Sequence, residues 1–249
     1  MIQSLDRGIQ VLLILAEKNS AGVTELAEAL GVDKSTASRL VETLRAHDMV
    51  RLDPETKKYR LGFRILHLGE SLKNNLNVIA IARPMLMELS GKISESVHFC
   101  AFNNNNVYVM DQVRSNKNYS LSATVGMIEP LHCSSVGKCI LAFRRPETIS
   151  ALLENYTFTK YTEHTITTKE ALMENLERIR SLGYAVDDEE MALGVRCLAV
   201  PVYDYRNSVR YSIGVSGPKG TINHANMETY IRRMVETTRK LSASIGSTR

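Results

Sequence analysis

Three clusters of small and polar residues have the types and spacing of a binding pocket. Residues 131–139 place small side chains at the expected start of a helix, where unpaired backbone N–H groups and the helix dipole attract an anion. Residues 183–190 form an acidic loop that leads toward Cys197, and residues 215–218 end an expected strand with a hydroxyl and a turn. Together these clusters predict a pocket for a small, oxygen-rich acid.

The first cluster also contains a nucleophile pattern. Ser135 and Lys138 form an S-x-x-K string, which in penicillin-binding enzymes joins a nucleophilic serine to an activating lysine. The sequence has neither the K-T-G nor the S-D-N string of those enzymes, and no comparable pairing of a histidine with an acid. A serine-dependent hydrolase is therefore an alternative, and a binding protein without catalytic residues is favoured.

A metal-responsive site is a second alternative. Zinc needs a converging tetrahedral set of ligands, and His98, Cys133, Asp187 and Cys197 could provide one, although their spacing neither supports nor excludes it. The four cysteines form no C-x-x-C pair, so free and mostly buried thiols are expected. These groups also have simple structural interpretations, in which Cys197 is a small core residue, Asp187 caps a loop and Ser216 ends a strand.

Residues 23–40 have the spacing of two helices that meet at a tight turn. Such a pair needs a small residue where the backbones approach and a residue tolerant of positive φ in the turn, and Ala27 and Gly31 supply these. Asp33 is placed to cap the second helix, whose apolar residues recur at helical spacing and face inward. The side chains left outside suit a recognition helix that contacts bases and phosphates; they are Lys34, Ser35, Thr36, Ser38 and Arg39. The alternative is a helical hairpin with a solvated polar face.

A basic hairpin follows this pair of helices. Residues 50–52 and 59–61 are short alternating segments, and the turn-rich residues 53–58 between them end in two lysines. A winged helix-turn-helix uses such a hairpin to reach the DNA backbone or the minor groove, so Lys57, Lys58 and Arg60 are predicted DNA contacts. Up to residue 64 there are ten basic and nine acidic side chains. The prediction therefore depends on where the charge lies, not on its amount.

The rest of the sequence predicts a second, larger domain. Helical spacing runs over residues 63–90, with expected interruptions at 73–75 and at Pro84. Strands are expected at 96–102, 107–113, 196–203 and 209–216, and helices at 136–143, 169–182 and 227–245. An asparagine-rich turn at 103–106 joins the first two strands. Antiparallel strands with helices predict an α+β sensor-like domain.

Composition and charge exclude several classes of protein. The 249 residues include 31 Lys and Arg against 27 Asp and Glu, and 44% are hydrophobic, which excludes disorder as the dominant state. No stretch approaches the roughly 18 apolar residues of a membrane helix. The early apolar run at 11–16 belongs to an amphipathic helix over 4–16 that Ser4 can cap, and not to a signal peptide. We therefore expect a cytoplasmic protein.

Motifs spread over nearly the whole sequence resemble the IclR family of bacterial transcriptional regulators. The matching residues are 4–7, 59–62, 137–138, 183–184, 189–190, 194–202 and 216–218. The resemblance implies an α+β protein in which an N-terminal winged helix-turn-helix is joined by a linker helix to a GAF/PAS-like α+β effector-binding domain. The implied boundaries are residues 1–64, 65–78 and 79–249.

The resemblance also implies an effector site. The ligand would be held by backbone N–H groups of Ser135 and Val136 and by the side chains of Asp187, Cys197 and Ser216. Two positions depart from the common pattern. Ser135-Val136 stands where Gly-Ala is frequent, which narrows the pocket, and Gly214 stands where a second serine is frequent, which removes a hydroxyl donor. Residues around 161–167 look closest to the sugar-acid-responsive branch, so the expected effector is a small organic acid similar to 2-keto-3-deoxygluconate.

The function implied by the resemblance is transcriptional regulation, more specifically repression, without a cofactor, a metal or an enzymatic activity. The expected partners are double-stranded operator DNA, the organic-acid effector and further copies of the chain. Dimers would place two recognition helices about 34 Å apart on a pseudopalindromic operator, and the family suggests that dimers pair into tetramers.

Overall fold

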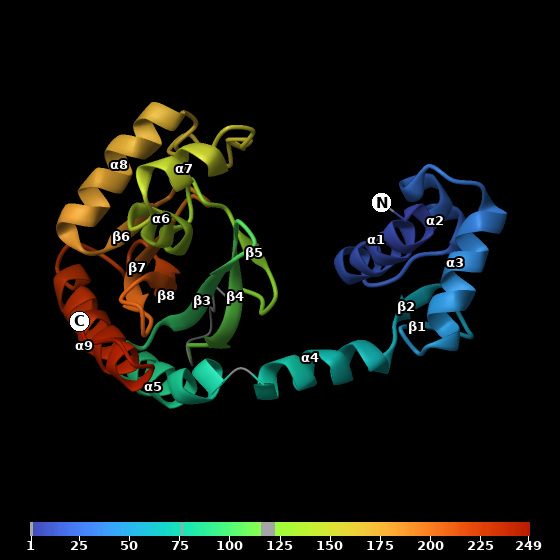
Figure 1. The fold of residues 1–249 in the computed structure, drawn as a ribbon, viewed down its shortest axis with the longest axis horizontal. Coiled ribbons are helices and arrows are strands. Elements are labelled where there is room, and N and C mark those ends of the chain that lie inside the picture. Colours follow the sequence, from blue (N-terminus) through green and yellow to red (C-terminus); the bar gives the residue numbers. More distant parts are fainter. Residues whose placement is uncertain (1, 76, 116–122) are drawn as a thin grey trace. The chain divides into compact units, whose positions relative to one another are not determined.

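The computed structural model describes the chain except Met1, Leu76 and residues 116–122, and the side chains of residues 72–77 are also not described. The chain divides into two compact units, Met1–Leu76 and Asn77–Arg249, each with its own hydrophobic core (Figure 1). Leu76, which falls in the predicted linker over 65–78, lies outside the described residues. Within the described parts of the chain, no helix combines the length and apolar character needed to span a membrane.

Unit 1 is a helix-turn-helix followed by a hairpin and a further helix. Its elements are α1 (Gln3–Lys18), α2 (Val23–Leu30), α3 (Lys34–Ala46), β1 (Val50–Leu52), β2 (Tyr59–Leu61) and α4 (Phe63–Asn75). The core is formed by side chains from the three first helices and the hairpin, among them Val11, Leu26, Val41 and Tyr59. Packing against this core holds the hairpin beside α3.

The turn between α2 and α3 has the predicted geometry. Gly31 adopts the left-handed conformation, with φ 62°, and Ala27 is buried. Asp33 is the N-cap of α3, as predicted. The predicted cap of the first helix is wrong, because α1 begins at Gln3 after Ile2, and Ser4 lies inside its first turn.

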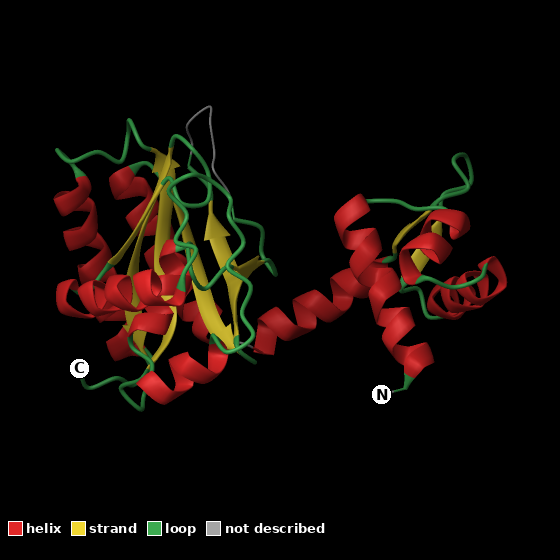
Figure 2. Cartoon of the chain, turned by 90° about the horizontal axis from the view of Figure 1, so that it is seen from above, coloured by secondary structure: helices red, strands yellow, loops and turns green. Residues whose placement is uncertain are grey.

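Unit 2 is an α+β domain built on one sheet. Its elements are α5 (Asn77–Ile93), β3 (Ser96–Asn103), β4 (Asn106–Val113), β5 (Ile128–Glu129), α6 (Ser135–Ala142), α7 (Pro146–Leu152), α8 (Lys169–Leu182), β6 (Ala185–Asp188), β7 (Val195–Tyr203), β8 (Val209–Pro218) and α9 (Met227–Ser244). The strands pair in the order β5-β4-β3-β8-β7-β6, and every pair is antiparallel. Figure 2 shows the strands of this sheet in yellow and the helices in red. The predicted α+β class is confirmed.

Helices cover both faces of this sheet. On one face, Cys100 of β3 belongs to a core with Ile140 of α6 and Leu176 of α8. On the other face, Leu198 of β7 belongs to a second core with Leu86 of α5 and Met234 of α9, among others. Because successive side chains of a strand point to opposite faces, alternate residues of the central strands enter one core or the other.

Two local predictions for this unit need correction and one is confirmed. Pro84 lies inside α5 and does not interrupt it. The acidic segment 183–190 is only partly a loop, because Ala185–Asp188 forms the edge strand β6, paired with β7. The asparagine turn forms as predicted, with Asn104 and Asn105 both at positive φ, 46° and 65°, which two-residue hairpin turns of this type require.

Candidate nucleic-acid interface and effector site

The start of α3 presents the predicted recognition residues, but its hydroxyls are already engaged by the cap. Asp33 accepts hydrogen bonds from the backbone N–H of Thr36 at 2.9 Å, from Ser35 Oγ at 2.6 Å and from Thr36 Oγ1 at 2.8 Å. These donors hold the pKa of Asp33 below its usual range. Lys34 and Arg39 are exposed, and no carboxylate of the described residues lies within ion-pair distance of either. The cations, rather than the hydroxyls, are therefore free to meet an external anion.

The hairpin formed by β1 and β2 is the predicted wing. Lys57 is exposed at its tip and adopts a positive φ of 55°. Lys58 lies 3.0 Å from Glu25 of α2, and Arg60 lies 3.3 Å from Asp53. Exposed pairs of this kind are weak, so both side chains can exchange their partners for a phosphate.

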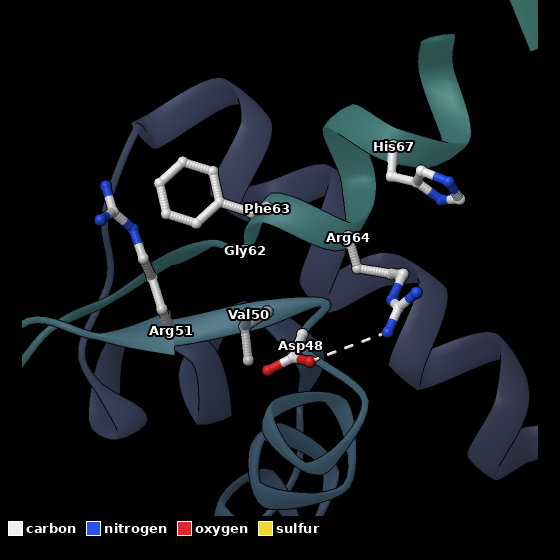
Figure 3. A pocket seen from close by; sticks show the side chains of 7 residues that line it. All are labelled: Asp48, Val50, Arg51, Gly62, Phe63, Arg64 and His67. Carbon is white, nitrogen blue, oxygen red and sulfur yellow. Dashed lines mark ion pairs between the residues drawn. The ribbon is translucent and has the colours of Figure 1, made fainter. Parts of the chain in front are cut away.

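A basic surface at the base of the wing was not predicted. It consists of Arg51, Phe63, Arg64 and His67, called here the wing-base surface, and it lines a hollow of about 510 Å³. Figure 3 shows these side chains rising from β1 and from the first turns of α4, around Asp48, Val50 and Gly62. The signal in the sequence was one arginine in the first strand of the hairpin, with a second arginine and a histidine soon after the hairpin ends.

Three predicted effector residues form one row across the sheet. Asp187 of β6 is the register partner of Cys197 in β7, and Cys197 is the register partner of Ser216 in β8. Register partners in neighbouring strands present their side chains on the same face. The row lies on the face that α6 covers, because Ala185 and Ala199, two residues along from Asp187 and Cys197, share a core with Val136.

The two remaining effector residues begin α6. Ser134 is the N-cap, and its Oγ accepts a hydrogen bond from Gly137 N at 3.0 Å. Ser135 and Val136 are the first two helical residues, where backbone N–H groups have no partner within the helix. Ser135, Val136 and Asp187 are all buried, each 2% exposed or less. The structure therefore describes a closed site.

A buried ion pair, also missed from the sequence, lies beside this row. Lys138 is fully buried, and its ammonium contacts Glu190 Oε1 and donates to the carbonyl of Val186 at 2.8 Å. Burial raises the pKa of Glu190 to about 7 and that of Asp187 to about 6. Glu129 of β5 is a third carboxyl of this group, with a pKa that burial also raises. The site thus holds three carboxyl groups and one ammonium.

The same contacts decide against the hydrolase alternative. Lys138 is held by Glu190 and Val186, so its amine is not directed at Ser135 in the way that an S-x-x-K nucleophile requires. The metal alternative also has no support, because no three histidine, cysteine or carboxylate side chains of the described residues are arranged so that they could hold one metal ion. Burial lowers the pKa of His98 to about 4. Burial, together with the nearby carboxyl groups of Asp187 and Glu190, raises the pKa of Cys133 to about 12, so both groups are held in their neutral forms.

Gly214, one of the departures from the family pattern, has a steric cause. A Cβ atom built on Gly214 would lie 2.1 Å from Nε2 of His98 and 2.7 Å from Cγ1 of Val136. The buried imidazole and the valine of the other departure therefore fill the space that a serine side chain at 214 would need. The two departures from the family pattern, at Val136 and at Gly214, therefore belong to one packing arrangement.

A segment over residues 156–165 crosses the start of α6. Tyr156 Oη accepts from Leu131 N at 2.9 Å and lies 2.9 Å from His132 Nδ1, while His132 Nε2 lies 2.9 Å from Thr159 O. Further along, Thr165 Oγ1 donates to Glu190 O at 2.6 Å. This segment therefore bonds to residues just before α6 and to Glu190 just after β6.

Comparisons with known proteins agree with this arrangement. Residues 4–54 match the family model described as the IclR helix-turn-helix domain, and residues 71–243 match that of the bacterial transcriptional regulator IclR C-terminal domain. The HTH-type transcriptional regulator KdgR of Escherichia coli (strain K12) is 30% identical over 245 residues, which cover 98% of this chain and 93% of that protein. The transcriptional repressor IclR of the same organism is 31% identical over 251 residues, covering 100% and 92%.

Solved structures show the same fold. The crystal structure of an IclR transcriptional regulator from Alicyclobacillus acidocaldarius superimposes with a TM-score of 0.87 at 25% identity, over 99% of this chain and 100% of that chain. The C-terminal domain of Escherichia coli KdgR gives a TM-score of 0.63 at 29% identity, over 69% of this chain and 100% of that chain. These relatives are named as transcriptional regulators and not as enzymes.

Proposed function

This chain belongs to the IclR family of bacterial transcriptional regulators and is a DNA-binding regulator, and we propose that it is a repressor controlled by a small organic acid. The observation that carries the proposed DNA contact is the exposed start of α3 beside a basic hairpin, with Lys34 and Arg39 free of ion pairs to the residues that the structure describes. Such an arrangement presents cations to a major groove and to the flanking backbone.

The proposed DNA contacts divide into two classes. Residues at the start of α3 enter the major groove, and residues of the wing contact phosphates. The contacts are Lys34, Ser35, Thr36, Ser38, Arg39, Lys57, Lys58 and Arg60. Because the hydroxyls of Ser35 and Thr36 donate to Asp33, they act toward DNA as acceptors, and Arg39 is the main donor to a base edge.

The proposed effector site is the row on the sheet together with the start of α6. The residues are Ser135, Val136, Asp187, Cys197 and Ser216. A ligand carboxylate suits the free N–H groups of α6, whereas the carboxyl groups of Asp187 and Glu129 suit hydrogen-bond donors. A sugar acid similar to 2-keto-3-deoxygluconate has both a carboxylate and hydroxyl groups. Because Ser135, Val136 and Asp187 are buried, the site must open for a ligand to enter.

We assign the proposed functions to domains with the predicted boundaries. Residues 1–64 bind DNA, residues 65–78 link, and residues 79–249 bind the effector. The effector changes operator affinity only if its own affinity differs between the conformation of the protein that binds DNA and the conformation that does not. Since its target is bacterial DNA, we place the protein in the cytoplasm.

We also propose that the chain acts as a homodimer, and as a tetramer of two dimers. The support is an apolar stripe along α1, made of Ile2 just before the helix and of Leu5, Ile9 and Leu13 within it, each at least half exposed. Burying one such side chain contributes roughly 1.5–3 kcal/mol, so a second copy of the chain that covers this stripe would be held firmly. A pair of units joined in this way would present two recognition helices to a pseudopalindromic operator.

The proposal is tested by fluorescence anisotropy of the full chain on labelled DNA from upstream of its own gene, at fixed salt, with and without a panel of sugar acids, keto acids and aromatic acids. We expect binding that exceeds binding to random DNA and that a sugar acid weakens. Asp187→Ala should retain operator affinity and lose most of the effector response. Equal affinity for random DNA would contradict the regulator, and an unchanged response of Asp187→Ala would remove Asp187 from the site.

A further inference from the structure

The wing-base surface carries positive charge that the protein itself does not neutralise. Arg51 is the register partner of Arg60 across the hairpin, and like charges directly opposite each other destabilise a sheet. Arg60 has Asp53 at 3.3 Å. In the described part of the chain, Arg51 has no carboxylate within ion-pair distance, and its guanidinium lies over the ring of Phe63, 5.2 Å from the centroid.

The second arginine of the surface is only weakly paired. Arg64 Nη2 lies 3.9 Å from Asp48 Oδ2, and both side chains are at least half exposed. An exposed pair at this distance contributes little. Asp48 is the one carboxylate among the lining residues, which also include the exposed His67. The hollow therefore has an excess of cations.

The ring of Phe63 lies on this surface and does not pack in a hydrophobic core. It is 73% exposed, so burial in its own chain does not explain a phenylalanine at this position. Its face holds the guanidinium of Arg51 by a cation–π contact, and the donor edges of the arginine have no partner among the described residues. A planar guanidinium supported in this way is suited to a phosphate, which it can bind through two parallel hydrogen bonds.

We propose that the wing-base surface binds the phosphodiester backbone of duplex DNA through Arg51 and Arg64. The surface continues the proposed wing contacts, because Arg51 lies directly across the hairpin from Arg60. An external phosphate bound at Arg51 offsets the repulsion between Arg51 and Arg60. It also supplies the acceptor that Arg51 lacks among the described residues. The inference rests on the DNA-binding function proposed above and extends its footprint from the wing to the first turns of α4.

The test is the salt dependence of DNA binding by the full-length chain. Affinity for a labelled duplex from upstream of the gene and for a random duplex of equal length is measured by anisotropy over a range of KCl concentrations. The variants are Arg51→Ala with Arg64→Ala, and the charge-conserving pair Arg51→Lys with Arg64→Lys. The matched control is Arg45→Ala, because Arg45 is as exposed as Arg64, in the same unit, but is already held by Glu42 through bonds of 3.0 and 2.7 Å.

Loss of both contacts should reduce the slope of log K against log salt by about 2, since each phosphate contact contributes about 0.9. This corresponds to a loss of affinity of about 30-fold near 0.15 M salt. The loss should be similar on both duplexes, because phosphate contacts carry no sequence information. The lysine pair should retain most of the slope, and Arg45→Ala should match the wild type.

The outcomes separate this inference from the proposed function. An unchanged slope for the double alanine variant, in a chain whose wild type binds its upstream DNA, overturns the inference alone. A wild type that does not prefer its upstream DNA overturns the proposed function as well. An equal loss in Arg45→Ala overturns the inference, because general charge then accounts for the effect. A loss accompanied by a change of oligomeric state, measured by sedimentation, also overturns it and assigns the surface to a second copy of the chain.

Discussion

Arg39 and Lys57 are both exposed cations of unit 1, but their positions predict different effects on DNA binding. Arg39 lies on α3, where it can reach a base edge, so Arg39→Ala should weaken binding to the operator by about 1–3 kcal/mol and relax its specificity. Lys57 lies at the tip of the wing, so Lys57→Ala should mainly reduce the salt slope by about 1. Anisotropy on operator and random DNA distinguishes the two effects. The assignment fails if both variants bind like the wild type.

Asp187 should give the stability of unit 2 a pH dependence of unusual sign. Burial raises its pKa to about 6 from an ordinary value of 3.8, so between these values the folded protein binds a proton that the unfolded chain has released. The stability connected with this carboxyl is present at low pH and decreases as the pH rises from about 4 through about 6. Asp187→Asn stays neutral, so its unfolding free energy relative to the wild type should rise by up to about 3 kcal/mol between about pH 4 and pH 7.5.

Urea unfolding at several pH values measures this difference. Asp188→Asn is the matched control, because hydrogen bonds from Arg196 lower the pKa of Asp188. The contribution of Asp188 to the folding stability is therefore present above the pKa of the unfolded chain and is lost as the pH falls. This pH dependence has the opposite sign to that of Asp187. Parallel pH profiles for wild type and Asp187→Asn would show that Asp187 titrates normally.

At the scale of elements, the close approach of the wing to the turn after α3 depends on Gly62. A Cβ atom there would lie 2.0 Å from the carbonyl oxygen of Asp48, and the N–H of Gly62 donates to Met49 O at 2.8 Å. Gly62→Ala should therefore destabilise unit 1 by about 1–3 kcal/mol, as overpacking typically does, and should displace the start of α4. Chemical unfolding measures the loss.

Gly69→Ala is the comparison for this prediction. Gly69 lies in α4, and a Cβ atom there would meet nothing within 4 Å. Alanine in place of an exposed helical glycine should stabilise the helix by up to about 1 kcal/mol. Opposite signs for the two substitutions are expected. Equal effects would mean that the backbone contact between Gly62 and Asp48 does not determine the junction.

At the scale of the whole molecule, the apolar stripe on α1 should couple two DNA-binding units. Ile9→Glu places a charge in the middle of the stripe, so operator affinity should fall toward the affinity for a half-site, because the two recognition helices are no longer held together. Anisotropy on full and half operators, with sedimentation for the oligomeric state, measures this coupling. Gln10→Glu, which adds the same charge to the neighbouring exposed position of α1, should retain the preference for the full operator. A preference retained by Ile9→Glu would place the dimer contact elsewhere.

The sequence by itself determined the local elements of this protein and its family. Asp33 as a cap, Gly31 in the turn, the paired asparagines at 104 and 105 and the helical spacing of α8 are local signals, because caps, turns and periodicity depend on residues a few positions apart. The interruption predicted at Pro84 from its local helix-breaking tendency is wrong, because α5 continues through the proline. Packing of α5 against the sheet, through residues such as Leu86, outweighs the local tendency to break.

Only the tertiary structure decided how the site is assembled. Lys138 and Glu190 are 52 positions apart, yet they form a buried ion pair, and Gly214 is needed because His98 of another strand fills the adjacent space. The residues next to each partner in the sequence carry no signal of such a pair. A buried charge or a glycine acquires its role only after strand register has brought distant residues together. The sequence named Asp187, Cys197 and Ser216 by resemblance, and strand register, which is a property of the whole sheet, placed them in one row.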